Sequence, residues 1–279
     1  FTYKNYFIQM KILIKNKEIN EALKKVSNLD FVPTMGGLHK GHEYLIKQSQ
    51  KRCKQTLVSI FVNPTQFNNK KDYLSYPKNL KKDLNILKKL KVNFVYIPNK
   101  KDIYSFKRKK KIVLKKENKV LCAKSRKGHF EGVIDIMDRL TNIIKPNKIF
   151  MGEKDYQQLL LVKKFIEKKY KTKIVPCKTI RNKNKLALSS RNQLLNKKDL
   201  IRAGKIAKNL FYFKIFLKNK KKIKNILKKK IKLFKKNFDI KIDYLEVRKK
   251  NNLKSSSTIK NSKIFIAYFI NKVRLIDNF

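Results

Sequence analysis

Between Met10 and about Cys177, short apolar runs alternate with amphipathic stretches, and this alternation constrains the fold more than any other feature of the chain. The clearest apolar run, TLVSIFVNP at 56–64, is closed by Asn-Pro, which is typical of a buried strand in a parallel sheet. Amphipathic helices are predicted between such strands, at 42–53, 76–90, 132–146 and 155–170. The alternation therefore predicts an α/β fold in which crossover helices join the strands of a parallel sheet.

The chain changes character after about Arg181. A Lys-rich segment at 221–237 has apolar residues near helical spacing, and stretches at 240–248 and 263–270 look like strands. An amphipathic basic helix can lie on a membrane or a nucleic acid, but more often it packs its apolar stripe on its own sheet, which we expect here. The segment after Arg181 is therefore predicted to be a smaller α+β unit.

Two domains follow from this change. We expect a larger domain over 10–181 and a smaller C-terminal domain over 182–279. Residues 1–9, FTYKNYFIQ, resemble neither a signal peptide nor part of a domain, so we predict a non-native or disordered leader with Met10 as the functional start.

The charge balance of the chain is extreme. Lys and Arg number 73 against 19 Asp and Glu, which gives a formal net charge of +54. Lysines gathered on one surface would indicate a nucleic-acid-binding protein, since they release counterions from phosphates. The lysines are instead spread along almost the whole chain, so we interpret the charge as compositional drift and expect no specific nucleic-acid partner.

Membranes and disulfides are not indicated either. No run of about 18 apolar residues occurs, so no membrane-spanning helix is expected. Cys53, Cys122 and Cys177 are odd in number and form no C-x-x-C pair, which suggests neither a disulfide framework nor a zinc site. Buried free thiols in a reducing cytoplasm are the expected state.

Scarce residues gather in PTMGGLHKGHEYLI at 33–46. The chain has only seven glycines and three histidines, and this stretch holds three of the glycines and two of the histidines. A strand runs into Met-Gly-Gly, and a helix is expected to open near His42, where free N–H groups can bind an anion and glycines let the backbone approach it. His39 and His42 can donate to phosphate oxygens. A tight turn with two surface histidines is the alternative.

Polar side chains also follow a second strand. Asn63 and Gln66 come just past the carboxyl end of the predicted strand at 56–62, which is where open parallel sheets bind ligands. Their neutral amides suit the hydroxyls and carboxylate of a small polar molecule. An Asx-turn that ends the strand explains Asn63 equally well.

Three more segments complete the pattern. KSRKGHFEGV contains the third histidine, His129, and MGEKDYQQL contains Gly152 and the point cation Lys154. LALSSRN provides two hydroxyls and the guanidinium of Arg191, which can bind phosphate oxygens. Six of the seven glycines and all three histidines lie in these motifs, which makes the joint signal much stronger than any one of them.

The motifs resemble, in order and spacing, those of the pantothenate synthetase (pantoate–β-alanine ligase) family. The matching segments are PTMGGLHKGH, VNPTQF with Tyr76-Pro77 after it, GHFEGV, GEKDYQQL, LALSSRN and the closing RLIDN. The resemblance covers about Met10 to Phe279. It implies a Rossmann-type nucleotidyltransferase domain of the HxGH kind, a smaller domain that closes over the site, and a homodimer.

The resemblance also implies a reaction. ATP would adenylate the carboxylate of pantoate with loss of pyrophosphate, and the amine of β-alanine would attack the adenylate to give pantothenate and AMP. Mg²⁺ is expected on the ATP phosphates, although only Asp83 suggests itself as a protein ligand, and weakly. The alternatives are another HxGH adenylyl- or cytidylyltransferase and, from a different class, a basic nucleic-acid-binding protein.

Site residues are implied position by position. His42 matches the proton donor of the family, and His39, Lys154, Ser189 and Arg191 should share the catalytic work. Pantoate and β-alanine should meet Gln66, Gln158 and Asn63. ATP should meet Met35, Gly36, Gly37, Leu38, His39, Lys40, Gly41, His42, Gly152, Glu153, Lys154, Asp155, Ile180, Leu188, Ser189, Ser190 and Arg191.

Three residues and one loop depart from the pattern. Lys127, Glu131 and Ala123 stand where the family commonly has proline, arginine and glycine, and NKNK at 182–185 lacks its usual glycine. These changes affect loops more than chemistry, so we expect the activity to survive in a slower or less stable enzyme.

Overall fold

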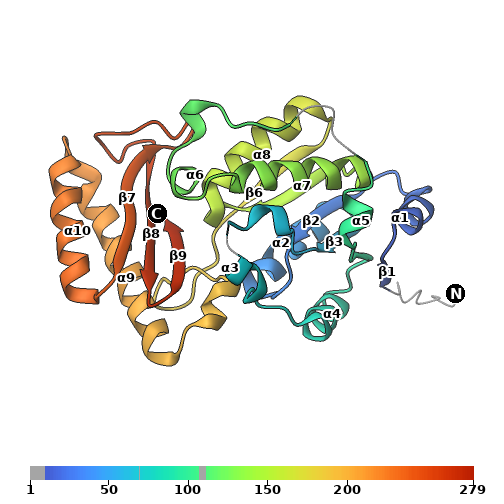
Figure 1. Ribbon diagram of the computed structural model, residues 1–279, viewed down its shortest axis with the longest axis horizontal. Helices are drawn as coiled ribbons and strands as arrows, with labels where there is room; N and C mark the ends of the chain where they lie inside the picture. The colour runs from blue at the N-terminus through green and yellow to red at the C-terminus, as the bar shows by residue number, and fades with distance from the viewer. Residues whose placement is uncertain (1–9, 69, 107–110) are drawn as a thin grey trace, which may run out of the picture.

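The computed structural model describes residues 10–68, 70–106 and 111–279, which contain two sheets at the two ends of the molecule (Figure 1). The predicted leader, residues 1–9, lies outside the described residues. The larger sheet has six parallel strands in the order β1-β4-β3-β2-β5-β6. Its strands are β1 (Lys11–Leu13), β2 (Asp30–Thr34), β3 (Thr56–Ile60), β4 (Phe94–Tyr96), β5 (Lys148–Gly152) and β6 (Lys173–Cys177). The predicted α/β class is confirmed.

Helices cover both faces of this sheet. One face packs on α1 (Asn16–Leu23), α7 (His129–Ile144) and α8 (Tyr156–Lys169). The other packs on α2 (Lys40–Gln50) and α4 (Leu80–Lys89). Successive residues of each central strand therefore enter opposite cores, which explains why the strands read as continuous apolar runs.

The strand order reverses at β2, whose neighbours are β3 and β5. Such a switch point leaves a crevice at the carboxyl ends of the strands, because the chain leaves in opposite directions on its two sides. Shorter elements surround this edge of the sheet. They are α3 (Lys70–Leu74), α5 (Lys100–Ile103), α6 (Cys122–Ser125), η1 (Pro64–Gln66), η2 (Lys116–Asn118), η3 (Glu153–Asp155) and η4 (Ser190–Leu194).

The smaller domain is an antiparallel sheet with two helices against one face. Its strands are β7 (Lys241–Lys249), β8 (Ser262–Ile270) and β9 (Val273–Asn278) in that order, and the helices are α9 (Lys197–Phe216) and α10 (Lys224–Phe238). A short turn, η5 (Leu217–Asn219), follows α9. The other face of the sheet packs against α6 and α8 of the larger domain, so the two domains share apolar contacts.

Some predicted boundaries differ from the structure. The helix expected near His42 begins at Lys40, because His39 caps it with its own side chain. The helix predicted at 76–90 begins only at Leu80, because Asn79 caps it by accepting the N–H of Lys82. The sequence reasoning also gave no helix at α9, although Asn196 caps it by accepting the N–H of Asp199.

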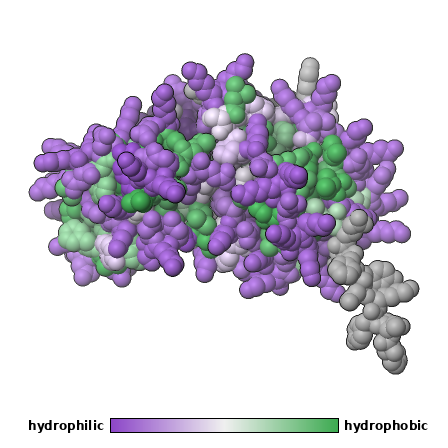
Figure 2. Space-filling model, turned by 90° about the horizontal axis from the view of Figure 1, so that it is seen from below, coloured by the Kyte–Doolittle hydropathy of each residue, from purple (hydrophilic) through white to green (hydrophobic). Residues whose placement is uncertain are grey.

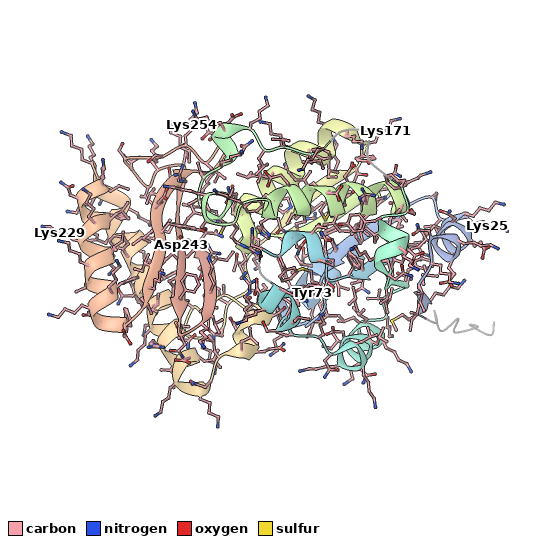
Figure 3. The ribbon with its side chains drawn as sticks, in the orientation of Figure 1. Lys25, Tyr73, Lys171, Lys229, Asp243 and Lys254 are labelled. Carbon is pink, nitrogen blue, oxygen red and sulfur yellow. The ribbon has the colours of Figure 1, made fainter. Side chains whose placement is uncertain are left out.

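Basic and apolar side chains both reach the surface. Lys25, Lys171, Lys229 and Lys254 point outward from widely separated parts of the molecule (Figure 3). Hydrophilic residues cover most of the face seen in Figure 2, with smaller apolar areas between them. Among the described helices, none is long and apolar enough to cross a membrane.

Candidate active site

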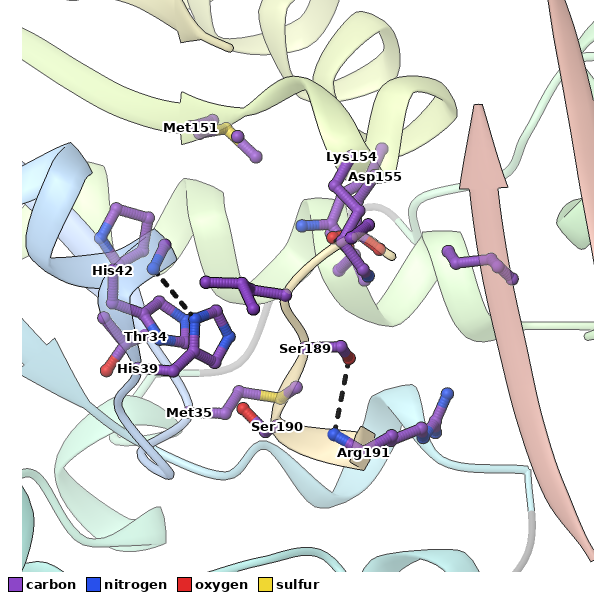
Figure 4. A pocket seen from close by; sticks show the side chains of 18 of the residues that line it. Thr34, Met35, His39, His42, Met151, Lys154, Asp155, Ser189, Ser190 and Arg191 are labelled. Atoms are coloured by element: carbon purple, nitrogen blue, oxygen red, sulfur yellow. Dashed lines mark hydrogen bonds and ion pairs between the residues drawn. The ribbon is translucent and has the colours of Figure 1, made fainter. Parts of the chain in front are cut away.

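A cavity of about 270 Å³ opens at the carboxyl ends of β2, β3 and β5, at the switch point of the sheet. Its walls come from the larger domain and from β8 and β9 of the smaller one, since Tyr268 and Arg274 line it. The predicted residues on its walls are Met35, His39, Gly41, His42, Asn63, Gln66, Gly152, Lys154, Asp155, Gln158, Ile180, Leu188, Ser189, Ser190 and Arg191. The structure therefore brings the separate motifs of the sequence to one cavity (Figure 4).

Five other residues predicted for the ATP site adjoin these walls along the chain without lining the cavity. They are Gly36, Gly37, Leu38, Lys40 and Glu153. Contact of any of these residues with ATP stays a prediction.

The loop after β2 is held by a buried carboxylate. Asp83 in α4 is 2% exposed, and its oxygens accept the N–H groups of Gly37 at 2.9 Å and Leu38 at 2.8 Å. Gly36 and Gly37 have φ angles of +77° and +62°, which side chains rarely tolerate. Gly36 and Gly37 thus shape the loop around Asp83. The expected approach of the glycine backbone to a ligand stays a prediction.

His39 and His42 lie against each other at the start of α2, with ring centroids 4.1 Å apart (Figure 4). Nδ1 of His39 accepts the N–H of Gly41 at 3.1 Å, so the proton of this ring resides on Nε2. A Cβ on Gly41 would lie 2.7 Å from the ring, which explains the glycine. Within the described residues, the buried Nδ1 of His42 has no hydrogen-bond partner. Both histidines line the cavity, where the protonated Nε2 of His39 can donate to a ligand, whereas the Nδ1 of His42 is shielded from it.

Burial keeps these histidines neutral. It lowers the pKa of His39 to about 4, with the charge of Lys154 as a smaller cause. Burial also lowers the pKa of His42 well below its usual range, assisted by His39 and Lys154. At neutral pH the pair can donate N–H hydrogen bonds but carries no charge.

The turn after β5 carries one of the cations of the cavity. Lys154 lies in η3, and its Nζ is 3.4 Å from a carboxylate oxygen of Asp155. The two glutamines that follow face different ways: Gln158 lines the cavity, while Gln157 is buried and donates to the carbonyl of Val120 at 2.7 Å. Gln157 therefore fixes a neighbouring segment, and Gln158 is the one placed for a substrate.

The LALSSRN segment closes another wall. Ser189 caps η4 by accepting the N–H of Arg191, and Ser190 donates to the carbonyl of Gly37 at 3.0 Å. Arg191 pairs with Asp72 of α3 at 2.9 Å. Ser190 thus ties this segment to the loop after β2, and the guanidinium of Arg191 is held between the cavity and α3.

Asn63 and Gln66 occupy the wall after β3. Asn63 is 1% exposed; it forms the Asx-turn by accepting the N–H of Thr65, and its Nδ2 donates to the carbonyl of Gly132 at 3.2 Å. The structural interpretation of Asn63 is therefore confirmed, while a contact with substrate stays a prediction. Gln66 lines the cavity, and its amide contacts the sulfur of Met35.

His129 explains the GHFEGV motif. Its Nδ1 donates to the carbonyl of Gln66 at 2.6 Å, so its Nε2 accepts from Arg126 at 2.8 Å. Burial, with the charge of Arg126 next, lowers the pKa of His129 to about 3. A Cβ on Gly132 would lie 2.6 Å from the carbonyl oxygen of Thr65, so this glycine lets α7 pack directly on η1. His129 and Gly132 therefore position Gln66 through its backbone and that of Thr65.

Sequence reasoning missed two arginines on the cavity wall. Arg126 and Arg274 line the cavity, and burial lowers the pKa of Arg126 to about 10, so its side chain remains charged at neutral pH. Both lie inside quoted motifs, KSRKGHFEGV and RLIDN, but lysine and arginine are so abundant in this chain that neither stood out.

One departure from the family pattern has a structural solution. Lys185, in the loop that lacks its usual glycine, has a φ angle of +70°. Its carbonyl accepts from Arg181 at 2.8 Å, which helps to hold this left-handed residue in place.

Metal-binding side chains do not gather in this cavity. In the part of the chain that the structure describes, no group of three His, Cys, Asp or Glu residues could hold a metal ion. Asp83 uses both oxygens on the loop after β2, so it is a poor candidate for a magnesium ligand. Mg²⁺ commonly keeps waters and binds substrate phosphates with few protein ligands, and such a mode fits these residues.

Comparisons with known proteins agree with this geometry. The family model for pantoate-beta-alanine ligase matches residues 10–279. A pantothenate synthetase from Pseudothermotoga lettingae is 38% identical over 280 residues, covering 96% of this chain and 98% of its own. Another from Francisella tularensis subsp. novicida is 40% identical over 263 residues, covering 94% and 92%.

Solved structures agree as well. Pantothenate synthetase from Thermus thermophilus has a TM-score of 0.90 at 28% identity and covers 97% of this chain and 99% of its own. Pantoate-beta-alanine ligase from Francisella tularensis, complexed with beta-gamma ATP and beta-alanine, has a TM-score of 0.83 at 36% identity and covers 97% of each chain. The chain therefore belongs to the pantoate-beta-alanine ligase family.

Proposed function

We propose that this protein condenses pantoate with β-alanine at the expense of ATP and releases pantothenate, AMP and pyrophosphate. The observation that carries the proposal is a single cavity that brings two kinds of side chain together. His39, Lys154 and Arg191, whose donors and charges suit phosphates, line the same cavity as the neutral amides of Gln66 and Gln158. Such a cavity suits a triphosphate beside a small hydroxy acid.

The reaction needs stabilisation of charge more than a protein nucleophile. A carboxylate oxygen of pantoate attacks the α-phosphorus of ATP, and the bond to the leaving pyrophosphate breaks. The neutral amine of β-alanine then attacks the acyl carbon, loses a proton, and displaces AMP. Lys154 and Arg191 are suited to bind the negative charge that develops on the phosphates, because fixed cations lower such barriers without reorganisation.

The histidines are suited to hydrogen bonding. His42 corresponds to the proton donor of the family, yet burial lowers its pKa in the free protein. We therefore assign it an N–H hydrogen bond to a phosphate oxygen, unless the bound triphosphate raises its pKa. His39 would donate through Nε2, since its Nδ1 accepts from Gly41. Mg²⁺ would enter as a complex with ATP and neutralise phosphate charge.

Further parts of the proposal concern the whole chain. We propose that the boundary between residues 181 and 182 separates the two domains, that the smaller one closes over the cavity, and that the protein is a homodimer in the cytoplasm. Sedimentation at several protein concentrations tests the homodimer, and a monomer mass throughout would rule it out.

An assay of partial reactions tests the activity. Purified protein with MgATP and pantoate should release pyrophosphate in a single burst, and addition of β-alanine should release AMP in equal amount to the pantothenate formed. Release of pyrophosphate with other carboxylic or phosphate acceptors, but not with pantoate, would instead identify another nucleotidyltransferase. No AMP in the complete mixture would overturn the proposal.

A further inference from the structure

The last strand of the smaller domain ends against the turn that carries Lys154. Asn278 closes β9, is 3% exposed, and lies beside η3. Its Nδ2 donates to the carbonyls of Glu153 and Lys154, both at 2.8 Å. These two residues are 125 and 124 positions away in the sequence, so the contact joins the two domains at the phosphate site.

The orientation of the Asn278 amide is fixed from both sides. Its Oδ1 accepts from Nζ of Lys263 at 2.9 Å, while its Nδ2 meets two carbonyl oxygens. A flipped amide would place its oxygen against both carbonyls and its nitrogen against the ammonium. The side chain therefore has one favourable orientation, and it uses both Nδ2 hydrogens on η3.

The turn needs such a partner. Glu153 and Lys154 precede the first residue of α8, so their carbonyls lie outside the regular helix. A carbonyl shielded from water without a hydrogen bond costs free energy, and Asn278 supplies a donor to both of these partly buried carbonyls. Asn278 thus fixes the backbone from which the Lys154 side chain extends into the cavity.

The neighbouring residue holds the other side of the site. Asp277 accepts from Arg181 in a bidentate ion pair at 2.7 and 2.8 Å, and Arg181 also donates to the carbonyl of Asn278 at 2.8 Å. Arg181 begins the loop that leads to Ser189, and it forms a β-bridge with Ala187 on the far side of that loop. Two consecutive residues at the end of β9 therefore contact both phosphate-facing segments.

We propose that Asn278 is a positioning residue for Lys154, through which the smaller domain sets the place of the cation in the adenylation step. Asn278 itself does not line the cavity. The inference rests on the proposed function in one respect, which is that Lys154 acts on the phosphates of ATP.

The first test is a double-mutant cycle on the pyrophosphate burst. Asn278→Asp keeps the size and the acceptor for Lys263, but it removes both donated hydrogen bonds and sets a carboxylate against two carbonyls. We expect the burst rate to fall by about tenfold or more, since small misplacements at a reacting centre are costly. In a Lys154→Ala background, the same change should alter the rate by less than about threefold, because residues that act through one another are not additive.

A purely structural role predicts a different cycle. Loss of folded protein would lower the rate by the same factor in both backgrounds, and that result would overturn the proposal. If Asn278→Asp does not fold, Asn278→Ala removes the donors without adding a charge and enters the same cycle with the same expectations. Asn271→Asp is the matched control: it breaks the bond from Nδ2 to Asp199, 2.8 Å long, at the β8–β9 turn, and should lower stability with the burst unchanged.

Hydrogen exchange separates this inference from the proposed function. Amide exchange in a peptide that spans η3 should become faster in Asn278→Asp than in wild type or Asn271→Asp, and this readout needs no activity. If the wild type releases no pyrophosphate with pantoate, the proposed function fails while the exchange still tests the contact. Equal exchange in all three proteins would overturn the positioning role.

Discussion

At the cavity, the histidines supply hydrogen bonds, while lysine and arginine supply positive charge. Burial holds the pKa of His39 at about 4 and that of His129 at about 3, so neither ring is charged at neutral pH. The positive charge on the cavity walls therefore comes from lysine and arginine, among them Lys154, Arg191 and Arg126. We therefore expect such a site to bind phosphates without a charged histidine.

Substitution of a charged or a hydrogen-bonding side chain should show how much each contributes to the rate of AMP formation. Lys154→Ala and His42→Ala should each lower kcat/KM for AMP formation by about a hundredfold to a thousandfold, because each removes a preorganised donor to developing charge. Thermal unfolding should show that both variants are folded. Lys163→Ala, an exposed lysine on α8, is the control and should retain its activity. Normal rates in folded Lys154→Ala or His42→Ala would refute the assigned roles.

A buried carboxylate far from the cavity predicts a pH effect. Asp30 is fully buried at the start of β2, and neither of its oxygens has a hydrogen-bond partner among the described residues. Burial raises the pKa of Asp30 from its ordinary 3.8 to about 6, against the opposing charges of Lys148 and Arg52. The fold favours the protonated form of Asp30. The contribution of this group to the free energy of unfolding is therefore complete below pH 3.8 and is lost as the pH rises through 6.

Asp30→Asn should abolish the loss of stability that accompanies ionisation of Asp30. The free energy of unfolding of the variant should exceed that of the wild type, and the gap should widen by about 1 kcal/mol between pH 5 and pH 8. Urea denaturation of both proteins at the two pH values measures it. A gap that narrows as the pH rises would show that the carboxylate is stabilised as an anion instead.

At the scale of elements, α7 packs directly on η1 at Gly132. Gly132→Ala would place a methyl group 2.6 Å from the carbonyl oxygen of Thr65, and neither backbone can yield without moving Gln66. We expect KM for pantoate or β-alanine to rise by about tenfold, together with a loss of about 1–3 kcal/mol in stability from overpacking.

A control substitution distinguishes the displacement of Gln66 from a general loss of stability. Ile144→Ala truncates a buried residue at the other end of α7 and should cost about 2–5 kcal/mol without a change in KM. Initial rates at varied substrate concentrations distinguish the two variants. If Ile144→Ala raised KM as much as Gly132→Ala, the contact with η1 would not be the cause.

Elements with a simple pattern were predictable. The buried strand β3 and helices α7 and α8 have apolar patterns that tertiary contacts reinforce. α9 was missed although its buried residues, such as Ala203, Ile206 and Ala207, have helical spacing, because lysines and exposed aromatic residues such as Tyr212 interrupt the pattern. β1 was missed because three residues at a sheet edge carry almost no pattern.

The site was predictable only as far as its residues are scarce. Glycine and histidine stood out in this composition, so the loops around His39 and Lys154 were found. Asp83, Arg126 and Asn278 were not assigned their roles, because each acts through contacts with segments far away in the sequence, such as Asp83 with Gly37. No local pattern encodes such a contact.

At the scale of the whole molecule, the net charge of +54 should oppose folding through repulsion among like charges. Screening should relieve it, so we expect the melting temperature to rise by several degrees between about 10 mM and 500 mM NaCl. Sodium sulfate at equal ionic strength is the comparison, since a larger rise at low concentration would indicate bound anions. A melting temperature that falls as salt increases would mean that ion pairs outweigh the repulsion.

The same charge bears on the nucleic-acid alternative. Binding that arises from spread lysines should be independent of DNA sequence and should weaken steeply as salt increases. DNA at physiological salt should then leave AMP formation unchanged. Sequence-specific binding that survives such salt would favour the alternative.

The bond from Asn278 to η3 also sets an order of events during synthesis. The six strands of the parallel sheet are complete once β6 has been made, so a growing chain can assemble the larger core early. The turn with Lys154 nevertheless waits for β9, which the ribosome adds 124 residues after it. We therefore expect a nascent chain to pass through a period in which its larger domain is folded and the turn with Lys154 is not yet fixed, and the synthesis of β9 ends that period.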